Sequence, residues 1–93
     1  MIKGFQGKET GKLWAGERSR KLPQDIQQLA RRKLRMLNNA HKLDDLRIPP
    51  ANRLERLRGE RSGQYSIRIS KPWRVCFVWK HGVALEVEVV DCR

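Results

Sequence analysis

Three runs of alternating residues in the last third of the chain constrain its fold more than any other feature. The runs span residues 65–69, 73–79 and 83–90. Every second residue in each run is apolar, which is the period of a strand with one buried face. Short turns at Lys71-Pro72 and Lys80-His81-Gly82 separate the runs, so we expect antiparallel neighbours. In the last run, the alternation predicts that Leu85 and Val87 share the buried face.

The first part of the chain predicts helices between further strands. Residues 2–6 fit a short first strand, residues 8–15 a brief helix and residues 53–57 a short strand. Residues 23–39 carry apolar side chains at a three-and-four spacing, and Pro23 is suited to the first helical position. The order β-α-α-β-β-β-β predicts an α+β fold, in which the helices cover one face of a curved, mainly antiparallel sheet. A length of 93 residues fits one domain over residues 1–93.

The charge of the chain indicates its partners. Lys and Arg number 21 against 10 Asp and Glu, a formal net charge of +11. Such an excess favours nucleic acid first, and an anionic membrane or an acidic protein next. No segment fits an export signal or a membrane span, and two cysteines do not make the disulfide framework of a small secreted domain. We therefore expect a cytoplasmic protein that does not associate with membranes.

No metal or other cofactor is expected from the residues that could bind one. The histidines and cysteines have no recurring ligand spacing, and the glycines form no phosphate-binding loop. Cys76 lies inside an alternating run, where it fits a small core side chain better than a nucleophile.

Basic residues are dense in the segment that is predicted to form strands and turns. The candidates are Arg53, Arg56, Arg58, Arg61, Arg68, Lys71 and Arg74. Strands project alternate residues to one side, so arginines can converge on one surface, where the planar guanidinium suits phosphate. Tyr65 and Trp73 lie among them and fit either a core face or a base-stacking position. These features favour RNA, single-stranded or structured, over insertion of a helix into the DNA major groove.

A second group of cations lies on the predicted helix over residues 23–39. Its members are Arg31, Arg32, Lys33 and Arg35. They fit an ordinary solvated helix face or an RNA-binding stripe, and the first interpretation is favoured because exposed helix positions accept Lys and Arg readily.

Several segments together resemble the HigB type of toxin in the RelE superfamily. They are residues 52–59 (NRLERLRG), 63–69 (GQYSIRI), 73–77 (WRVCF) and 88–91 (EVVD), with 1–5 (MIKGF) and 33–38 (KLRMLN). The resemblance implies a toxin of a bacterial type II toxin–antitoxin pair that cuts mRNA in the ribosomal A site without a metal. It also implies a helix-turn-helix antitoxin, HigA-like, through which alone the toxin would meet operator DNA.

The resemblance also implies roles for residues at the expected cleft. Arg74 matches the arginine that stabilises the scissile phosphate in the family. Arg58 falls where related toxins carry a lysine and is therefore a further catalytic candidate. Glu55 falls where some relatives carry a histidine, and a carboxylate there can orient a group or act as a base. Relatives typically end in Asp-Tyr-His, whereas this chain ends in Asp91-Cys92-Arg93.

That departure leaves two alternatives to a cleaving toxin. One is a protein of the same fold that binds RNA or its antitoxin with weakened or absent cleavage, because an aromatic and an imidazole are both missing. The other is a basic interaction module unrelated to translation.

Overall fold

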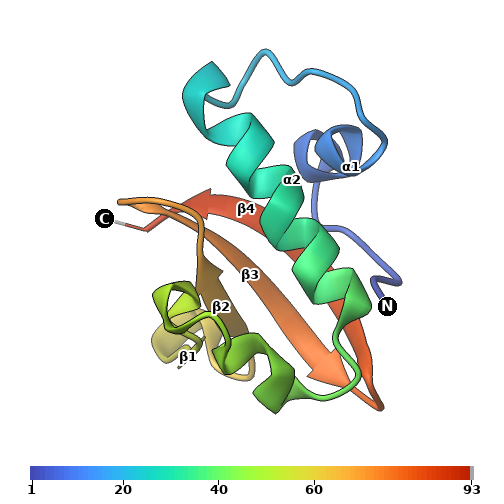
Figure 1. Ribbon diagram of the computed structural model, residues 1–93, viewed down its shortest axis with the longest axis vertical. Helices are drawn as coiled ribbons and strands as arrows, with labels where there is room; N and C mark the ends of the chain where they lie inside the picture. Colours follow the sequence, from blue (N-terminus) through green and yellow to red (C-terminus); the bar gives the residue numbers. More distant parts are fainter. Residues whose placement is uncertain (93) are drawn as a thin grey trace.

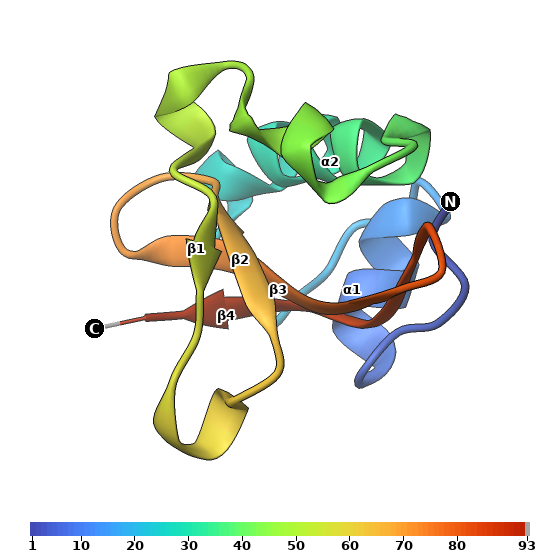
Figure 2. The same ribbon diagram turned by 90° about the horizontal axis from the view of Figure 1, so that it is seen from below.

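A computed structural model describes residues 1–92 and contains one antiparallel sheet with the strand order β1-β2-β3-β4. The strands are β1 (Glu55–Arg56), β2 (Tyr65–Arg68), β3 (Trp73–Lys80) and β4 (Val83–Asp91). Two helices, α1 (Lys8–Trp14) and α2 (Gln24–Asn39), pack on one face of the sheet (Figure 1). The sheet is strongly twisted (Figure 2), as expected for a short antiparallel sheet. The predicted α+β class, with both helices on one face, is confirmed.

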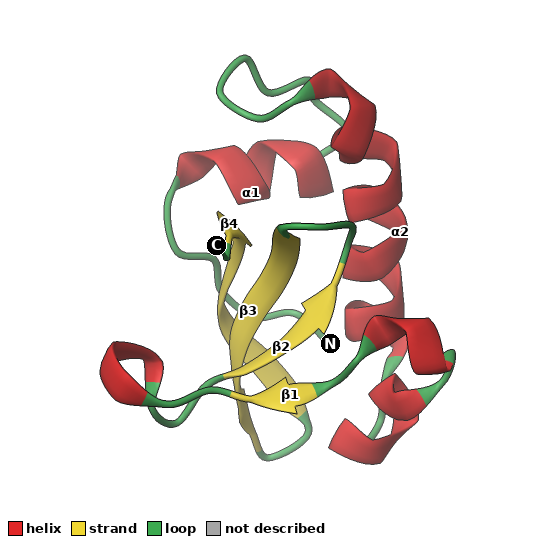
Figure 3. Ribbon diagram, turned by 90° about the vertical axis from the view of Figure 1, so that its left-hand side faces the viewer, coloured by secondary structure: helices red, strands yellow, loops and turns green. Residues whose placement is uncertain are grey.

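Short 3-10 helices connect the larger elements. They are η1 (Leu43–Arg47), η2 (Pro50–Asn52) and η3 (Gly59–Arg61). Figure 3 shows η1 and η2 between the end of α2 and β1, and η3 between β1 and β2. No helix among residues 1–92 is both long enough and apolar enough to cross a membrane.

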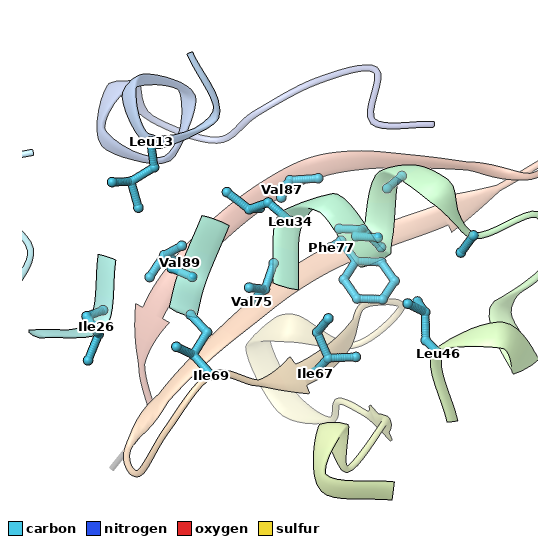
Figure 4. Close-up of a cluster of buried hydrophobic side chains, with 14 residues drawn as sticks. Leu13, Ile26, Leu34, Leu46, Ile67, Ile69, Val75, Phe77, Val87 and Val89 are labelled. Carbon is cyan, nitrogen blue, oxygen red and sulfur yellow. The ribbon is translucent and has the colours of Figure 1, made fainter. Parts of the chain in front are cut away.

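The core lies between the helices and the sheet, as the helical spacing predicts. Ile26, Ala30, Leu34 and Leu37 of α2 are buried, together with Leu13 of α1. They pack on buried side chains of the sheet, and Figure 4 shows Val75, Phe77 and Val87 among them. The predicted helix is confirmed to within one residue, since Pro23 is the N-cap rather than the first helical residue.

The predicted first strand is wrong. Ile2 and Phe5 make only two isolated parallel bridges, with Ala84 and Val87 of β4. Between these bridges β4 bulges at Glu86, whose φ is 51°. Because the bulge interrupts the line of hydrogen-bonding groups, the N-terminal segment cannot form a continuous ladder there.

The bulge also overturns the predicted alternation in the last strand. Two β4 residues stand between Leu85 and Glu88, whereas only Phe77 separates their β3 partners Val78 and Cys76. The extra residue changes the face of the side chains that follow. Ala84, rather than Leu85, is therefore fully buried before the bulge, and Val87 is buried after it.

The strand predicted over residues 53–57 is shorter than expected. Only Glu55 and Arg56 pair with β2. Arg53 has a left-handed backbone, with φ 45° and ψ 58°, and ends η2. A residue in that conformation cannot extend a strand, so pairing begins two residues later.

Candidate functional site

A cationic pocket opens where the β2–β3 turn meets the end of β4. Its volume is about 340 Å³, and it is lined by Arg53, Arg68, Ser70, Lys71, Pro72, Arg74 and Cys92. Arg68 and Arg74 are direct partners in the β2–β3 register. The backbone N–H of Cys92 donates to the carbonyl of Pro72 at 3.0 Å, which brings the end of the chain to the turn. Among the described residues, no Asp or Glu lines this pocket, hereafter the cleft.

Arg74 is the most firmly held cation of the cleft. Its Nε donates to Ser66 Oγ at 2.7 Å and its Nη2 to the carbonyl of Arg53 at 2.6 Å. Both acceptors are neutral, and the exposed carboxylate of Glu55 makes a long ion pair with Arg74, with Oε2 3.9 Å from Nη2. The side chain is only 13% exposed. Arg74 is thus fixed in orientation by neutral groups, with a single exposed carboxylate at long range, which suits stabilisation of a phosphate that gains negative charge.

A buried polar pair supports the backbone next to Arg53. Asn52 is fully buried, and its Nδ2 donates to the carbonyl of Leu46 at 3.1 Å and to that of Ile48 at 3.4 Å. Lys33 Nζ donates to Asn52 Oδ1 at 2.6 Å. These bonds link α2 to the turn at Asn52. The carbonyl of the following residue, Arg53, accepts the hydrogen bond that orients Arg74. The segment is anchored because a buried amide without its partners costs free energy.

The placement of Lys33 corrects the predicted basic stripe on α2. Lys33 is 7% exposed, whereas Arg32 and Arg35 are exposed. Desolvation by burial lowers the pKa of the Lys33 ammonium. The helical period did not reveal this, because η2 covers a position that would otherwise face solvent.

The other cations of α2 belong to a separate hollow. Arg31 Nε donates to the carbonyl of Leu13 at 3.1 Å, and its Nη2 donates to that of Glu17 at 2.6 Å. Arg31 and Arg35, with Arg18 and three glutamines, line a hollow of about 610 Å³. This hollow shares no lining residue with the cleft.

The remaining predicted site residues lie at different distances from the cleft. Arg56 and Arg58 are exposed and do not line it, and Glu55 is exposed at its edge. Asp91 is exposed at the end of β4, next to Cys92. Arg93 lies outside the described residues.

Arg61 and Cys76 lie outside the cleft, and both neighbour Glu88 of β4. Arg61 Nη2 is 3.1 Å from Glu88 Oε1, an ion pair that joins η3 to β4. Cys76 pairs with Glu88 in register and lies between the core residues Val75 and Phe77, so its side chain points to the opposite face. It is fully buried as predicted, but outside the apolar cluster. Burial first, and then the neighbouring Cys92, raise the pKa of the Cys76 thiol to about 11.

The two aromatic residues near the predicted RNA surface belong to the core. Tyr65 stacks on Phe77 with ring centroids 6.2 Å apart. Trp73 packs on the same apolar cluster. Neither lines the cleft.

Sequence reasoning missed Ser66 and Asn52, the two polar residues that position Arg74 and Arg53. Ser66 had one usable signal, because it alternates with Tyr65 and Ile67 and so shares a face with Arg74. Asn52 gave none, since an asparagine after two prolines is ordinary turn composition. Among the described residues, no three His, Cys, Asp or Glu side chains group closely enough to hold a metal ion.

Comparisons with known proteins relate this chain to a family of toxins. A family model described as "RelE-like toxin of type II toxin-antitoxin system HigB" matches residues 3–92. Toxin HigB-1 of Vibrio cholerae is 46% identical over 69 residues, which are 74% of this chain and 73% of that protein. An uncharacterized protein of Haemophilus influenzae is 36% identical over 66 residues, or 71% of this chain and 63% of that protein.

Proposed function

This chain belongs to the HigB-like family of RelE-like toxins of type II toxin–antitoxin systems, and from that premise we propose that it cleaves mRNA in the ribosomal A site. The observation that carries the proposal is the state of Arg74. Neutral acceptors orient its guanidinium in a cleft with three more cations and no lining carboxylate among the described residues. Such a cleft suits a polyanion with a phosphate at its centre.

The reaction proposed is attack of a ribose 2′-hydroxyl on the adjacent phosphorus. The 2′-oxygen–phosphorus bond forms and the bond from phosphorus to the 5′-oxygen breaks, which leaves a 2′,3′-cyclic phosphate and a free 5′-hydroxyl. Arg74 stabilises the negative charge on the phosphate oxygens in the transition state. Glu55, whose carboxylate is 3.9 Å from Arg74 Nη2, is the candidate acceptor of the 2′-hydroxyl proton.

The end of the chain is the candidate source of the second proton transfer. The leaving 5′-oxygen must take up a proton. Cys92 lines the cleft and Asp91 precedes it, so these residues, with Arg93, are proposed to complete the site. The cations Arg53, Arg68 and Lys71 are proposed to hold the RNA backbone along the cleft.

The proposed partners are the ribosome with its mRNA and a HigA-like helix-turn-helix antitoxin, and the proposed location is the cytoplasm. Operator DNA is reached only through the antitoxin in this proposal. The exposed cations Arg32 and Arg35, together with Arg56, Arg58 and the half-exposed Arg31, are candidates for the surface that contacts ribosomal RNA.

Primer extension on a defined mRNA, with and without ribosomes, tests the proposal. We expect cuts that need ribosomes and that disappear in Arg74→Ala. Arg47→Ala is the matched control, because Arg47 is exposed and pairs only with Asp44 on η1 among the described residues. Cutting that survives in Arg74→Ala contradicts the mechanism.

A second candidate function follows from the residues at positions 92 and 93, which replace the tyrosine and histidine typical of relatives. It is a toxin-fold protein that enters the A site and blocks it without cutting. Ribosome binding with no cuts in the same experiment, for the unmodified chain, supports this candidate.

A further inference from the structure

Another hollow, called the second hollow below, lies beside the cleft and is distinct from the hollow lined by Arg31 and Arg35. Its volume is about 460 Å³, and it is lined by Leu29, Lys33, Ala51, Arg53, Arg68, Ile69, Ser70 and Lys71. Four of these residues, Arg53, Arg68, Ser70 and Lys71, also line the cleft. These four residues line both depressions and are called the shared wall below.

The residues that belong to the second hollow alone differ in chemistry from those of the cleft. Three of them are apolar: Leu29 comes from α2, Ala51 from η2 and Ile69 from the position after β2. The fourth is Lys33 of α2, whose ammonium is bonded to Asn52. The residues that belong to the cleft alone are Pro72, Arg74 and Cys92. The second hollow alone therefore adds mainly apolar surface, with the bonded Lys33 beside it, and the cleft alone adds the oriented guanidinium of Arg74.

The cations of the shared wall are available to bind an anion. The side chains of Arg53, Arg68 and Lys71 make no hydrogen bond or ion pair with any described residue, and no Asp or Glu among residues 1–92 lines either hollow. Arg53 is also held in a left-handed backbone conformation. A non-glycine residue keeps such a conformation only where its surroundings enforce it, which here is the bonded turn at Asn52.

We propose that the second hollow is a subsite for the base of one nucleotide, the neighbour of the scissile phosphate. A nucleotide joins an anionic phosphate to a flat base with apolar faces, so it fits a cationic wall next to an apolar depression. The phosphate binds the wall, and the base lies against Leu29, Ala51 and Ile69. The inference rests on the proposed function for its location in the mRNA, but the binding itself needs neither ribosomes nor cleavage.

Nuclear magnetic resonance of the labelled full chain tests the subsite with inorganic phosphate and the four nucleoside 3′-monophosphates as probes. We expect phosphate to shift signals of the wall and of Arg74 only. The nucleotides shift these signals and also the methyl signals of Leu29 and Ile69, and at least one binds about tenfold more tightly than phosphate, as expected when a base packs on protein surface. Methyl signals that no nucleotide moves overturn the proposal.

A variant that fills the hollow gives a second test. Ala51 is exposed, so Ala51→Trp places a large side chain in the depression without entering the core. We expect the nucleotides to lose their tenfold advantage in this variant while phosphate affinity stays unchanged. Gln28→Trp is the control, because Gln28 is exposed on α2 and lines the separate basic hollow.

The two possible failures are distinguishable. Unchanged nucleotide affinity in folded Ala51→Trp excludes the base subsite whatever the primer-extension result is. If the unmodified chain binds nucleotides in the second hollow but makes no ribosome-dependent cuts, the proposed nuclease activity is excluded and the base subsite is not.

Discussion

Arg61 and Arg74 are two arginines next to the same sheet, and the structure uses them in opposite ways. Arg61 is joined to a carboxylate, with Glu88 Oε1 at 3.1 Å from its Nη2. Arg74 is joined to a hydroxyl and a carbonyl, at 2.7 and 2.6 Å. The first arrangement neutralises a charge, whereas the second fixes a charge in place and leaves it available.

The charges around the two arginines differ as well. Partial burial alone would lower the pKa of Arg61, but the hydrogen bond and charge of Glu88 outweigh it and raise that pKa. Around Arg74, the charged side chains that line the cleft, those of Arg53, Arg68 and Lys71, are cations. A site for an anionic ligand needs cations that are oriented before the ligand arrives and that no resident carboxylate neutralises. Arg74 comes closer to these conditions than Arg61, because its one carboxylate neighbour among the described residues, Glu55, is exposed and 3.9 Å away.

The largest expected effect separates the two arginines by activity. Arg74→Lys keeps the charge but loses the forked contacts to Ser66 and Arg53, so we expect ribosome-dependent cleavage to fall by about 100-fold. Arg61→Lys retains an ion pair with Glu88 and is expected to change cleavage by less than about twofold. Single-turnover cleavage of ribosome-bound mRNA measures both. Equal losses of cleavage in the two variants would contradict a catalytic role that is specific to Arg74.

The next effect concerns the support beneath the cleft. Asn52→Ala leaves Lys33 Nζ and two backbone carbonyls without their buried partner, so we expect the free energy of unfolding to fall by about 2–3 kcal/mol. Urea unfolding followed by circular dichroism measures the loss. Asn39→Ala, on an exposed asparagine at the end of α2, is the control and should change stability by less than about 0.5 kcal/mol. A similar small loss in Asn52→Ala would mean that the turn does not depend on this pair.

The contrast between Arg74 and Asn52 also shows what the sequence could predict. Local alternation placed β2 and β3, and with them the face that carries Ser66, Arg68 and Arg74. The resemblance added the role of Arg74. The support from Lys33 and Asn52 was not predictable, because it depends on η2 folding over α2 across 19 residues.

The bulge in β4 was hidden for a similar reason. Its sequence alternates regularly through Glu86, and only pairing with β3 and with the N-terminal segment exposes the extra residue. Short-range patterns thus predicted the two α-helices, the last three strands and the arginine-bearing face. Contacts distant in sequence decided which cations are buried and which are free to bind.

A smaller effect on the free energy of unfolding should come from the Cys76 thiol as the pH rises. The Cys76 thiol has a pKa of about 11 in the native protein and 9.0 in the reference state, so between these values the native state binds more protons than the unfolded state. The free energy of unfolding therefore falls as the pH rises from 9 to 11, by about 2 kcal/mol from this group at the upper limit. Urea unfolding at several pH values measures the decline.

Cys76→Ala should show a shallower decline over the same pH interval, because it lacks the titrating thiol. The unmodified chain is the reference, because Cys92 itself contributes to the raised pKa of Cys76. A thiol reagent at pH 8 gives an independent measurement, with Cys92 reacting in the native protein and Cys76 only after unfolding. Equal pH dependence in Cys76→Ala and in the unmodified chain would contradict a buried, neutral Cys76.

The smallest effect tests the ion pair that distinguishes Arg61 from Arg74. Glu88→Gln removes a partly exposed charge partner, so we expect a loss of at most about 1 kcal/mol in the free energy of unfolding. Because this variant leaves Arg61 unneutralised on the sheet, it should also strengthen nonspecific binding of single-stranded RNA and steepen its salt dependence. Fluorescence anisotropy with a labelled RNA at two salt concentrations measures both changes. Unchanged RNA binding would mean that freeing an arginine is not sufficient, and that the fixed orientation seen at Arg74 is the property that matters.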